Sequence, residues 1–215
     1  MIKNIFFDFN GTILDDLQVC FEIESEMFEM EGLPQISLDF YKENFSFPVR
    51  EYYKKVGFDV EKDADYDRLA KYFFKEYTRR QADESKLYDG LVDCLVKLKE
   101  DNYKLFILTA TEKKLLIEQL KHLGIDMYFD GFAACDDIHA KGKIEYGKEF
   151  ISKNHIDPSE SLMIGDCLHD FEVANEIGLK PVLFSQGHNS LKTLQKVNAP
   201  IVNSFEEFYK LVKTL

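Results

Sequence analysis

Short apolar runs that stop at a polar residue or a glycine recur along this chain, and they constrain its fold more than any other feature. Runs of this kind are typical of strands that are buried on both faces of a parallel sheet. Between them, apolar residues recur at helical spacing near 91–98, 115–123 and 171–177. This alternation predicts an α/β fold built on a doubly wound, Rossmann-like parallel sheet. The apolar runs lie at 5–7, 104–108, 161–164 and 181–184.

The stretch 16–88 interrupts this alternation. It contains no convincing buried strand, but its apolar residues follow helical spacing around 17–28 and 66–77. We therefore predict an all-helical cap domain at 16–88, inserted into a core domain that comprises 1–15 and 89–215. A cap inserted after the first strand lies beside the carboxyl ends of the sheet, where it can close over a ligand.

Composition narrows the choice of partners. The 215 residues include 27 Lys and Arg against 39 Asp and Glu, a formal net charge of −12, which argues against a broad surface for nucleic acid or for anionic membranes. No apolar run reaches the roughly 20 residues of a membrane helix. The cysteines are widely spaced and show no metal-ligand pattern, which indicates reduced thiols in a cytoplasmic protein. We expect a small-molecule partner and a monomer or weak dimer.

Polar residues follow three of the predicted strands, and the carboxyl ends of parallel strands share one edge of a sheet. Asp8 follows the first strand, Thr109 the second and Asp166 the third. The Asp8 carboxylate could attack phosphorus and form an aspartyl-phosphate. Gly11 lets the backbone turn so that amides face an anion. Together these residues predict a phosphate site at that edge.

Oxygen ligands for a metal ion gather at the same predicted edge. Asp166 and Asp170 lie four residues apart around a strand-to-helix turn, and with Asp8 they form a cluster that suits Mg²⁺, a hard cation. Such an ion would neutralise phosphate charge and orient the phosphoryl group for in-line attack. The Thr109 hydroxyl and the nearby amides, including that of Ala110, would bind phosphate oxygens.

These motifs, taken together and in this order, resemble those of the haloacid dehalogenase superfamily. They are residues 8–15 (DFNGTILD), 107–109 (ILT), a lysine near 143 and 165–170 (GDCLHD). The resemblance extends over essentially the whole chain and points to the phosphatase branch with a helical cap, as in phosphoglycolate phosphatase and β-phosphoglucomutase. It implies that Asp8 is the nucleophile and that Mg²⁺ is held by Asp8, Asp166, Asp170 and the backbone carbonyl of Asn10. The phosphate ligands that it implies are Asp8, Gly11, Thr12, Thr109, Ala110 and Lys143.

The motif lysine has two candidates in the sequence, Lys141 and Lys143. Lys143 falls better at the start of a helix that runs through 146–150. A buried lysine there would pair with Asp8 and the phosphate and would limit their charge repulsion. Alternatively, both lysines could be solvated charges of a loop.

Asn10 departs from the family pattern, which has Asp two residues after the nucleophile. In the resemblance that Asp protonates the leaving oxygen and later activates water, and an amide can do neither. General acid–base assistance is typically worth roughly 10²–10⁴ in rate. Three explanations stay open: a substrate such as an acyl phosphate, whose leaving group needs little protonation, a substitute acid, or lost turnover. Asp15 and Glu24 are the candidate substitutes.

Glu24 and Arg50 are the tentative substrate contacts in the cap. On a helix that begins at Leu17, Glu24 shares the face of apolar residues, so its carboxylate must be paired, lie at an edge or face the active-site cleft. Arg50 could clamp a carboxylate or a second phosphate of the substrate, or it could be an exposed charge at a helix start.

The sequence thus predicts a Mg²⁺-dependent hydrolase of small phosphate monoesters, with acyl phosphates or phosphoglycolate-like compounds as candidate substrates. Its catalytic residues would be Asp8, Asn10 and Lys143. The alternatives are a catalytically impaired protein that binds a phosphometabolite or acts as a regulator, and a phosphotransferase or mutase.

Overall fold

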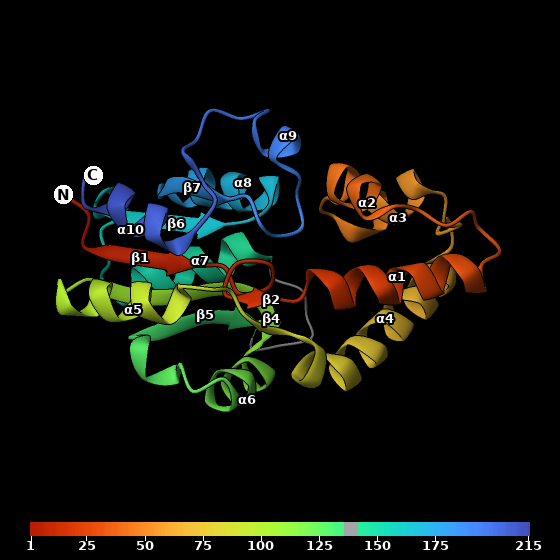
Figure 1. Ribbon diagram of the computed structural model, residues 1–215, viewed down its shortest axis with the longest axis horizontal. Helices are drawn as coiled ribbons and strands as arrows, with labels where there is room; N and C mark the ends of the chain where they lie inside the picture. The colour runs from red at the N-terminus through yellow and green to blue at the C-terminus, as the bar shows by residue number, and fades with distance from the viewer. Residues whose placement is uncertain (136–141) are drawn as a thin grey trace.

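A computed structural model shows a parallel β-sheet with a group of helices beside the carboxyl ends of its strands (Figure 1). The structure describes residues 1–135 and 142–215. Within these residues the sheet has six strands, all parallel, in the order β5-β4-β1-β6-β7-β8. They are β1 Asn4–Phe7, β4 Lys104–Glu112, β5 Gly131–Cys135, β6 Ser161–Gly165, β7 Lys180–Phe184 and β8 Ile201–Val202. The predicted α/β fold is confirmed.

The apolar runs of the sequence form strands β1, β4, β6 and β7, as predicted. Burial on both faces explains why these runs are continuously apolar, since Ile5, Phe6 and Phe7 are all inaccessible to solvent. The sequence does not predict β5 and β8, because β5 is built largely from small residues and β8 has only two residues. Both lie at edges of the sheet, where an apolar run is less necessary.

The helices that cover the sheet are α5 Leu91–Glu100, α6 Lys113–His122, α7 Lys143–Lys153, α8 Leu168–Ile177 and α10 Phe205–Val212. Helices α5, α6 and α10 pack on the face that carries Phe7, and α7 and α8 pack on the face that carries Phe6. Neighbouring residues of a strand point to opposite faces, so β1 anchors two separate apolar clusters. The remaining short helices are α9 Leu191–Leu194, η1 Asp126–Tyr128 and η2 Pro158–Glu160.

The cap lies beside the carboxyl ends of the strands (Figure 1). Its helices are α1 Leu17–Met30, α2 Leu38–Asn44, α3 Val49–Val56 and α4 Asp63–Glu84. Their buried residues, from Val19 to Tyr77, form an apolar cluster that is distinct from the two clusters on the sheet. On this ground we propose a cap domain at 16–88 and a core domain at 1–15 and 89–215.

A two-stranded antiparallel ribbon connects the core to the cap. It pairs β2 Leu14–Asp15 with β3 Lys86–Leu87. Because β2 follows the loop after β1 directly, the chain enters the cap only a few residues beyond Asp8. The entrance to the cap and the end of the central strand are therefore tied together by the backbone.

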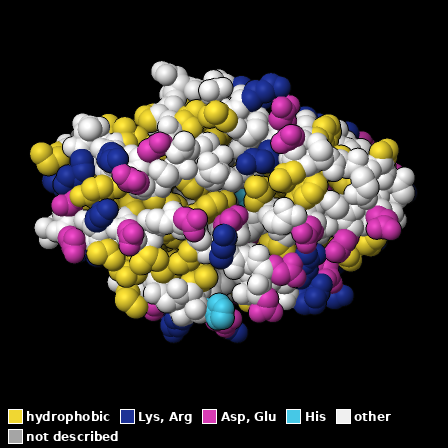
Figure 2. Space-filling model, in the orientation of Figure 1, with side chains coloured by type: hydrophobic (Ala, Val, Ile, Leu, Met, Phe, Trp, Pro, Cys, Tyr) yellow, Lys and Arg dark blue, Asp and Glu magenta, His cyan; other side chains and the backbone are white. Residues whose placement is uncertain are grey.

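The surface carries charges of both signs. On the face drawn in Figure 2, Lys and Arg side chains are interspersed with Asp and Glu side chains. Among the residues that the structure describes, no helix is both long enough and apolar enough to cross a membrane.

Phe208→Ala tests the apolar cluster beneath α10. Phe208 is fully buried, and its ring centroid lies 5.8 Å from that of Phe7 and 6.5 Å from that of Phe205. Because the truncation leaves a cavity as well as removing buried surface, we expect the free energy of unfolding to fall by about 3–5 kcal/mol.

Urea denaturation followed by circular dichroism measures the change. The control is Leu191→Ala at an exposed position of α9, which should change the free energy by less than about 0.5 kcal/mol. Equal losses in the two variants would contradict this account of the core.

Candidate active site

Asp8 lies directly after the central strand, at the edge of the sheet that faces the cap (Figure 1). The residue is 8% exposed, and its Oδ1 accepts a hydrogen bond from Lys143 Nζ at 2.5 Å. The same Nζ donates to Asp170 Oδ1 at 2.6 Å. The structure thus brings Asp8, Asp170 and Lys143 together and places Lys143 at the first turn of α7. Lys141, the other candidate, lies outside the described residues.

Lys143 lies between the buried carboxylates of Asp8 and Asp170 and bonds to both. Burial raises the pKa of Asp8, the Lys143 charge lowers it, and Asp170 raises it again, with a net increase. Burial lowers the pKa of Lys143, but Asp170 and Asp8 raise it by more, so its pKa lies above that of an ordinary lysine. The ammonium therefore stays charged at neutral pH and stabilises negative charge at Asp8.

The turn between β6 and α8 supplies buried carboxylates that are bonded by backbone N–H groups and by side chains. Asp166 accepts from the His188 backbone N–H at 2.6 Å and from Thr12 Oγ1 at 3.2 Å. Asp170 accepts from the Cys167 backbone N–H at 2.9 Å, as part of a capping box at the start of α8. The two side chains are therefore held in fixed orientations before any ligand binds.

Glycines give these carboxylates the room that they occupy. A Cβ atom at Gly165 would lie 2.3 Å from Asp170 Cγ, and one at Gly187 would lie 2.3 Å from Asp166 Oδ2. Gly11 has a φ of +74°, which favours glycine, and a Cβ there would lie 2.5 Å from the same Asp166 oxygen. A side chain at any of the three positions would displace a carboxylate.

The donor set fits a divalent cation that prefers oxygen ligands. Asp166 and Asp170 offer oxygen atoms within 4.8 Å of each other, and Asp8 shares the Lys143 ammonium with Asp170. Burial raises the pKa of Asp166, and the neighbouring Asp170 adds to the increase. A cation would relieve this crowding of negative charge, and Mg²⁺ favours carboxylate and carbonyl oxygens. Asp8, Asp166, Asp170 and the backbone carbonyl of Asn10 are the groups that would hold it.

Thr109, the predicted phosphate contact, is buried near the end of β4. Its hydroxyl donates to Thr111 Oγ1 at 3.1 Å and accepts from the Thr111 backbone N–H, also at 3.1 Å. Ala110, between them, is exposed. Thr111 Oγ1 in turn donates to Asn10 Oδ1 at 2.9 Å, so a chain of hydrogen bonds joins β4 to the loop after β1. The phosphate-binding roles of Thr109 and Ala110 stay predictions.

Asn10 directs its side chain toward the cap. Its Nδ2 donates to Asp16 Oδ2 at 2.8 Å and to the Tyr77 hydroxyl at 2.6 Å. Asp16 is the residue before α1, and Tyr77 belongs to α4. The position where the family pattern has its acid–base Asp therefore contributes to the contact between core and cap.

Asp16 and His188 are site residues that the sequence does not single out. His188 Nε2 lies 3.2 Å from Asp16 Oδ1, and His188 Nδ1 lies 2.9 Å from the Tyr41 hydroxyl. Burial lowers the pKa of His188, but the hydrogen bond and charge of Asp16 raise it to about 9. Burial raises the pKa of Asp16, but His188, Tyr77 and Asn10 together lower it by more, so the pKa of this carboxyl is below its usual value. An ion pair thus joins the entrance of the cap to the loop after β7. In the sequence, the polar run 187–190 (GHNS), which follows the last predicted strand, is the only signal that points toward His188.

Glu24 lies inside the cap. It is 2% exposed, and the Tyr52 hydroxyl donates to its Oε1 at 2.5 Å. Burial raises the pKa of Glu24 to about 7, an increase that the Tyr52 hydrogen bond only partly offsets. Of the three environments predicted for this carboxylate, the structure shows the paired one. Its roles as a substrate contact and as a substitute acid stay predictions.

Arg50 is bound within the cap as well. Its Nη2 and Nε donate to the Val60 carbonyl at 2.8 and 3.0 Å, and its Nη1 lies 2.6 Å from Asp63 Oδ1. These bonds fasten the loop between α3 and α4, and a clamp on substrate would have to compete with them. That clamp stays a prediction. The other predicted substitute acid, Asp15, is half-buried in β2, and burial raises the pKa of its carboxyl.

The chain is similar to known proteins along nearly its whole length. The sequence profile of the haloacid dehalogenase-like hydrolases matches residues 5–184. A phosphoglycolate phosphatase of Chromobacterium violaceum is 24% identical, across 99% of this chain and 97% of that protein. An N-acetylmuramic acid 6-phosphate phosphatase of Pseudomonas putida is 24% identical, across 87% of this chain and 84% of that protein. The crystal structure of a predicted phosphatase from Clostridium acetobutylicum has the same fold, with a TM-score of 0.86 at 20% identity and 100% of both chains covered.

Glu24→Gln should change how stability depends on pH. The pKa of Glu24 is about 7 in the folded protein against 4.5 for an ordinary glutamate, so folding favours the protonated carboxyl. The contribution of the protonated Glu24 carboxyl to stability is complete below the ordinary pKa of 4.5 and is lost as the pH rises through the folded-state pKa of about 7. Glutamine stays neutral, so we expect the melting temperature of the variant to rise relative to that of the wild type from about pH 5 to about pH 8. Each unit of pKa difference corresponds to about 1.4 kcal/mol.

Thermal melts at a series of pH values measure this effect. Glu29→Gln, at an exposed position of the same helix, is the matched control and should run parallel to the wild type. Parallel curves for Glu24→Gln as well would show that the buried carboxylate carries no penalty at high pH.

Proposed function

We propose, since the chain belongs to the haloacid dehalogenase-like hydrolase family, that it is a phosphatase that hydrolyses small phosphate monoesters through a covalent intermediate on Asp8. One observation carries the proposal: a buried carboxylate at the end of the central strand, bonded to the Lys143 ammonium and surrounded by the carboxylates of Asp166 and Asp170. The phosphatases to which the chain is similar support the same activity.

The Asp8 carboxylate is the nucleophile in this proposal. One of its oxygens attacks phosphorus, the bond from phosphorus to the ester oxygen breaks, and the leaving group departs with the bonding pair as an alkoxide or a carboxylate. Water then attacks the phosphorus of the aspartyl-phosphate, which releases inorganic phosphate and regenerates the carboxylate. Lys143 stabilises the charge on the phosphoryl oxygens, and Thr109 offers them a hydroxyl. When bound, Mg²⁺ would neutralise phosphate charge and orient the phosphoryl group.

Asn10 restricts the substrates that such a site can turn over quickly. The amide has no proton to give to a leaving oxygen, and its side chain is bonded to Asp16 and Tyr77. A leaving group that is stable as an anion needs no such proton. We therefore propose acyl phosphates as the preferred substrate class, and we expect slower turnover of phosphoglycolate-like esters, because their leaving group is an alkoxide.

The second candidate function is binding of a phosphorylated metabolite without rapid turnover. The observation that favours it is that the Asn10 side chain is bonded to the cap. An amide at this position cannot act as a general acid, while the residues proposed to bind phosphate are still present. A substrate panel separates the two functions. It contains an acyl phosphate, an aryl phosphate, phosphoglycolate and several sugar phosphates, each assayed with Mg²⁺ for release of inorganic phosphate. Release from the acyl phosphate at a higher rate than from the sugar phosphates supports the hydrolase, whereas binding by calorimetry with no release from any compound supports the second function.

Asp8→Asn should abolish turnover. An amide oxygen is a poor nucleophile, so we expect kcat to fall by at least about 10³-fold, within the range seen when a nucleophile is removed. The wild type, quenched in acid during turnover, should carry the mass of one added phosphoryl group on the peptide that contains Asp8. A melting temperature close to that of the wild type would show that Asp8→Asn is folded. Undiminished turnover in this variant would rule out Asp8 as the nucleophile.

Removal of divalent cations should abolish turnover reversibly. After dialysis against EDTA we expect no phosphate release, and we expect recovery on addition of Mg²⁺, because the three carboxylates otherwise repel the phosphate. Binding can be read without any substrate, since a ligand of the folded state raises the melting temperature. That increase should occur with Mg²⁺ in the wild type and should be lost in Asp166→Asn. Full activity in EDTA would contradict the metal site.

A further inference from the structure

Asp16 occupies the N-cap of α1, but its carboxylate does not cap the helix. Aspartate at this position usually accepts a bond from the backbone of the first turn, and here no such bond forms. The side chain is 1% exposed and accepts instead from Tyr77 OH at 2.7 Å, Asn10 Nδ2 at 2.8 Å and the Gly11 backbone N–H at 2.9 Å. His188 Nε2 lies 3.2 Å from the same carboxylate, and Cys20 Sγ donates to it at 3.8 Å. Tyr77 and Cys20 belong to the cap and the other three partners to the core, so one carboxylate joins the two domains.

Asn10 has the hydrogen-bonding groups that this carboxylate requires. Its two amide hydrogens go to Asp16 and to the Tyr77 oxygen, and its Oδ1 accepts from Thr111. Tyr77 has a single hydroxyl hydrogen, and it donates that hydrogen to Asp16. An ionised carboxylate at position 10 would have no hydrogen to donate and would place oxygen against oxygen at both contacts.

We propose that Asn10 is a positioning residue that fixes the cap against the core through Asp16. The amide at position 10 and the carboxylate at position 16 form a matched pair, and the contact between cap and core at this point depends on that match. The inference concerns cap closure and goes beyond the proposed hydrolysis, which it does not require. The aromatic and imidazole groups around the pair extend the same contact, since Tyr41 of α2 bonds His188 Nδ1 at 2.9 Å.

The activity of Asn10→Asp alone therefore cannot separate the effect of an added acid from the effect of a lost hydrogen bond to Asp16. Asn10→Asp provides the acid of the family pattern, but it also sets two carboxylates against each other where Asn10 Nδ2 and Asp16 Oδ2 are now 2.8 Å apart. The double variant Asn10→Asp/Asp16→Asn exchanges donor and acceptor between the two positions. It restores an amide-to-carboxylate hydrogen bond with the net charge of the wild type.

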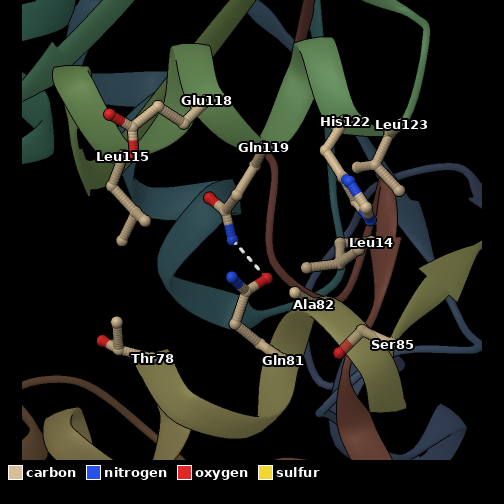
Figure 3. Close-up of a pocket in the computed structure, with 10 residues that line it drawn as sticks. All are labelled: Leu14, Thr78, Gln81, Ala82, Ser85, Leu115, Glu118, Gln119, His122 and Leu123. Atoms are coloured by element: carbon tan, nitrogen blue, oxygen red, sulfur yellow. Dashed lines mark hydrogen bonds between the residues drawn. The ribbon is translucent and has the colours of Figure 1, made fainter.

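A hydrogen bond between cap and core that lies apart from Asn10 and Asp16 provides the control. In the pocket between the end of α4 and α6, Gln119 Nε2 donates to Gln81 Oε1 at 2.7 Å (Figure 3). Gln119→Met removes this bond with little change in volume. It breaks a contact between cap and core without touching Asn10 or Asp16, so its effect should add to that of Asn10→Asp and should not be coupled to it.

Hydrogen–deuterium exchange of the whole protein, in EDTA and without substrate, measures the proposed contact. We expect peptides from the start of α1 and from α4 around Tyr77 to exchange about tenfold faster in Asn10→Asp and in Asp16→Asn. That factor corresponds to an opening free energy lower by about 1.4 kcal/mol. In the double variant, exchange of the same peptides should return to within about threefold of the wild type. Peptides from α5 and α10, in the core, should be unchanged in all variants.

Wild-type exchange of α1 and α4 in both single variants would overturn the proposal. So would a double variant whose exchange is the product of the two single effects, because independent sites add in free energy. If Asn10→Asp does not fold, Tyr77→Phe decides the matter, since it removes the hydroxyl between the two side chains without adding charge. Faster exchange of α4 in Tyr77→Phe supports the proposal, and unchanged exchange overturns it. Because these readouts use neither substrate nor metal, they stand or fall separately from hydrolysis at Asp8.

Discussion

The bond between Lys143 and two buried carboxylates is the interaction on which the rest of the site depends. The register of the sheet sets Phe7 opposite Ile107 on one side and Ile164 on the other, so the segments after these three strands emerge side by side. Two of those segments carry carboxylates, and withdrawing carboxylates from water is costly unless a cation is near. Lys143 supplies one positive charge to Asp8 and Asp170. The remaining negative charge is the physical reason to expect a divalent cation before a phosphate can bind.

The loop after β1 serves the site and the cap at once. Asp8 faces Lys143, Gly11 turns the chain beneath Asp166, and Asn10 faces Asp16 and Tyr77. These residues are neighbours in sequence, yet they act on different parts of the molecule because a tight turn points successive side chains in different directions. The cap has its own apolar cluster, so its helices can form whatever its position. Its position against the core is set by polar contacts at its entrance, where the Asp16 carboxylate lies, and by contacts of α2 and the following loop with the segment 186–193.

Apolar runs and helical spacing in the sequence predicted those elements whose burial follows from local sequence. The buried strands follow from apolar runs, Lys143 from the start of a helix, and the place of Glu24 among apolar residues from the helical spacing of α1. Strand β5 lacks such a pattern because its residues are small. The Asp16–His188 pair joins residues 172 positions apart, and no periodicity encodes such a contact. The engagement of Arg50 by the Val60 carbonyl has the same cause, since the conformation of a loop decides which carbonyl a guanidinium reaches.

Asn10 affects the two chemical steps of the proposed reaction differently. In the first step the leaving group comes from the substrate, and the missing acid matters for an alkoxide but little for a carboxylate, whose pKa is about 4. In the second step the leaving group is the Asp8 carboxylate itself, so no acid is needed and only the activation of water is missing. If Asp16 fixes the cap as proposed, the cap would also limit the access of water to this buried carboxylate. Both effects slow the second step more than the first when the substrate is an acyl phosphate. The pairing of Asn10 with Asp16 therefore favours a long-lived phosphorylated Asp8, which would link the two candidate functions, since a protein that turns over slowly in this way also retains the phosphoryl group.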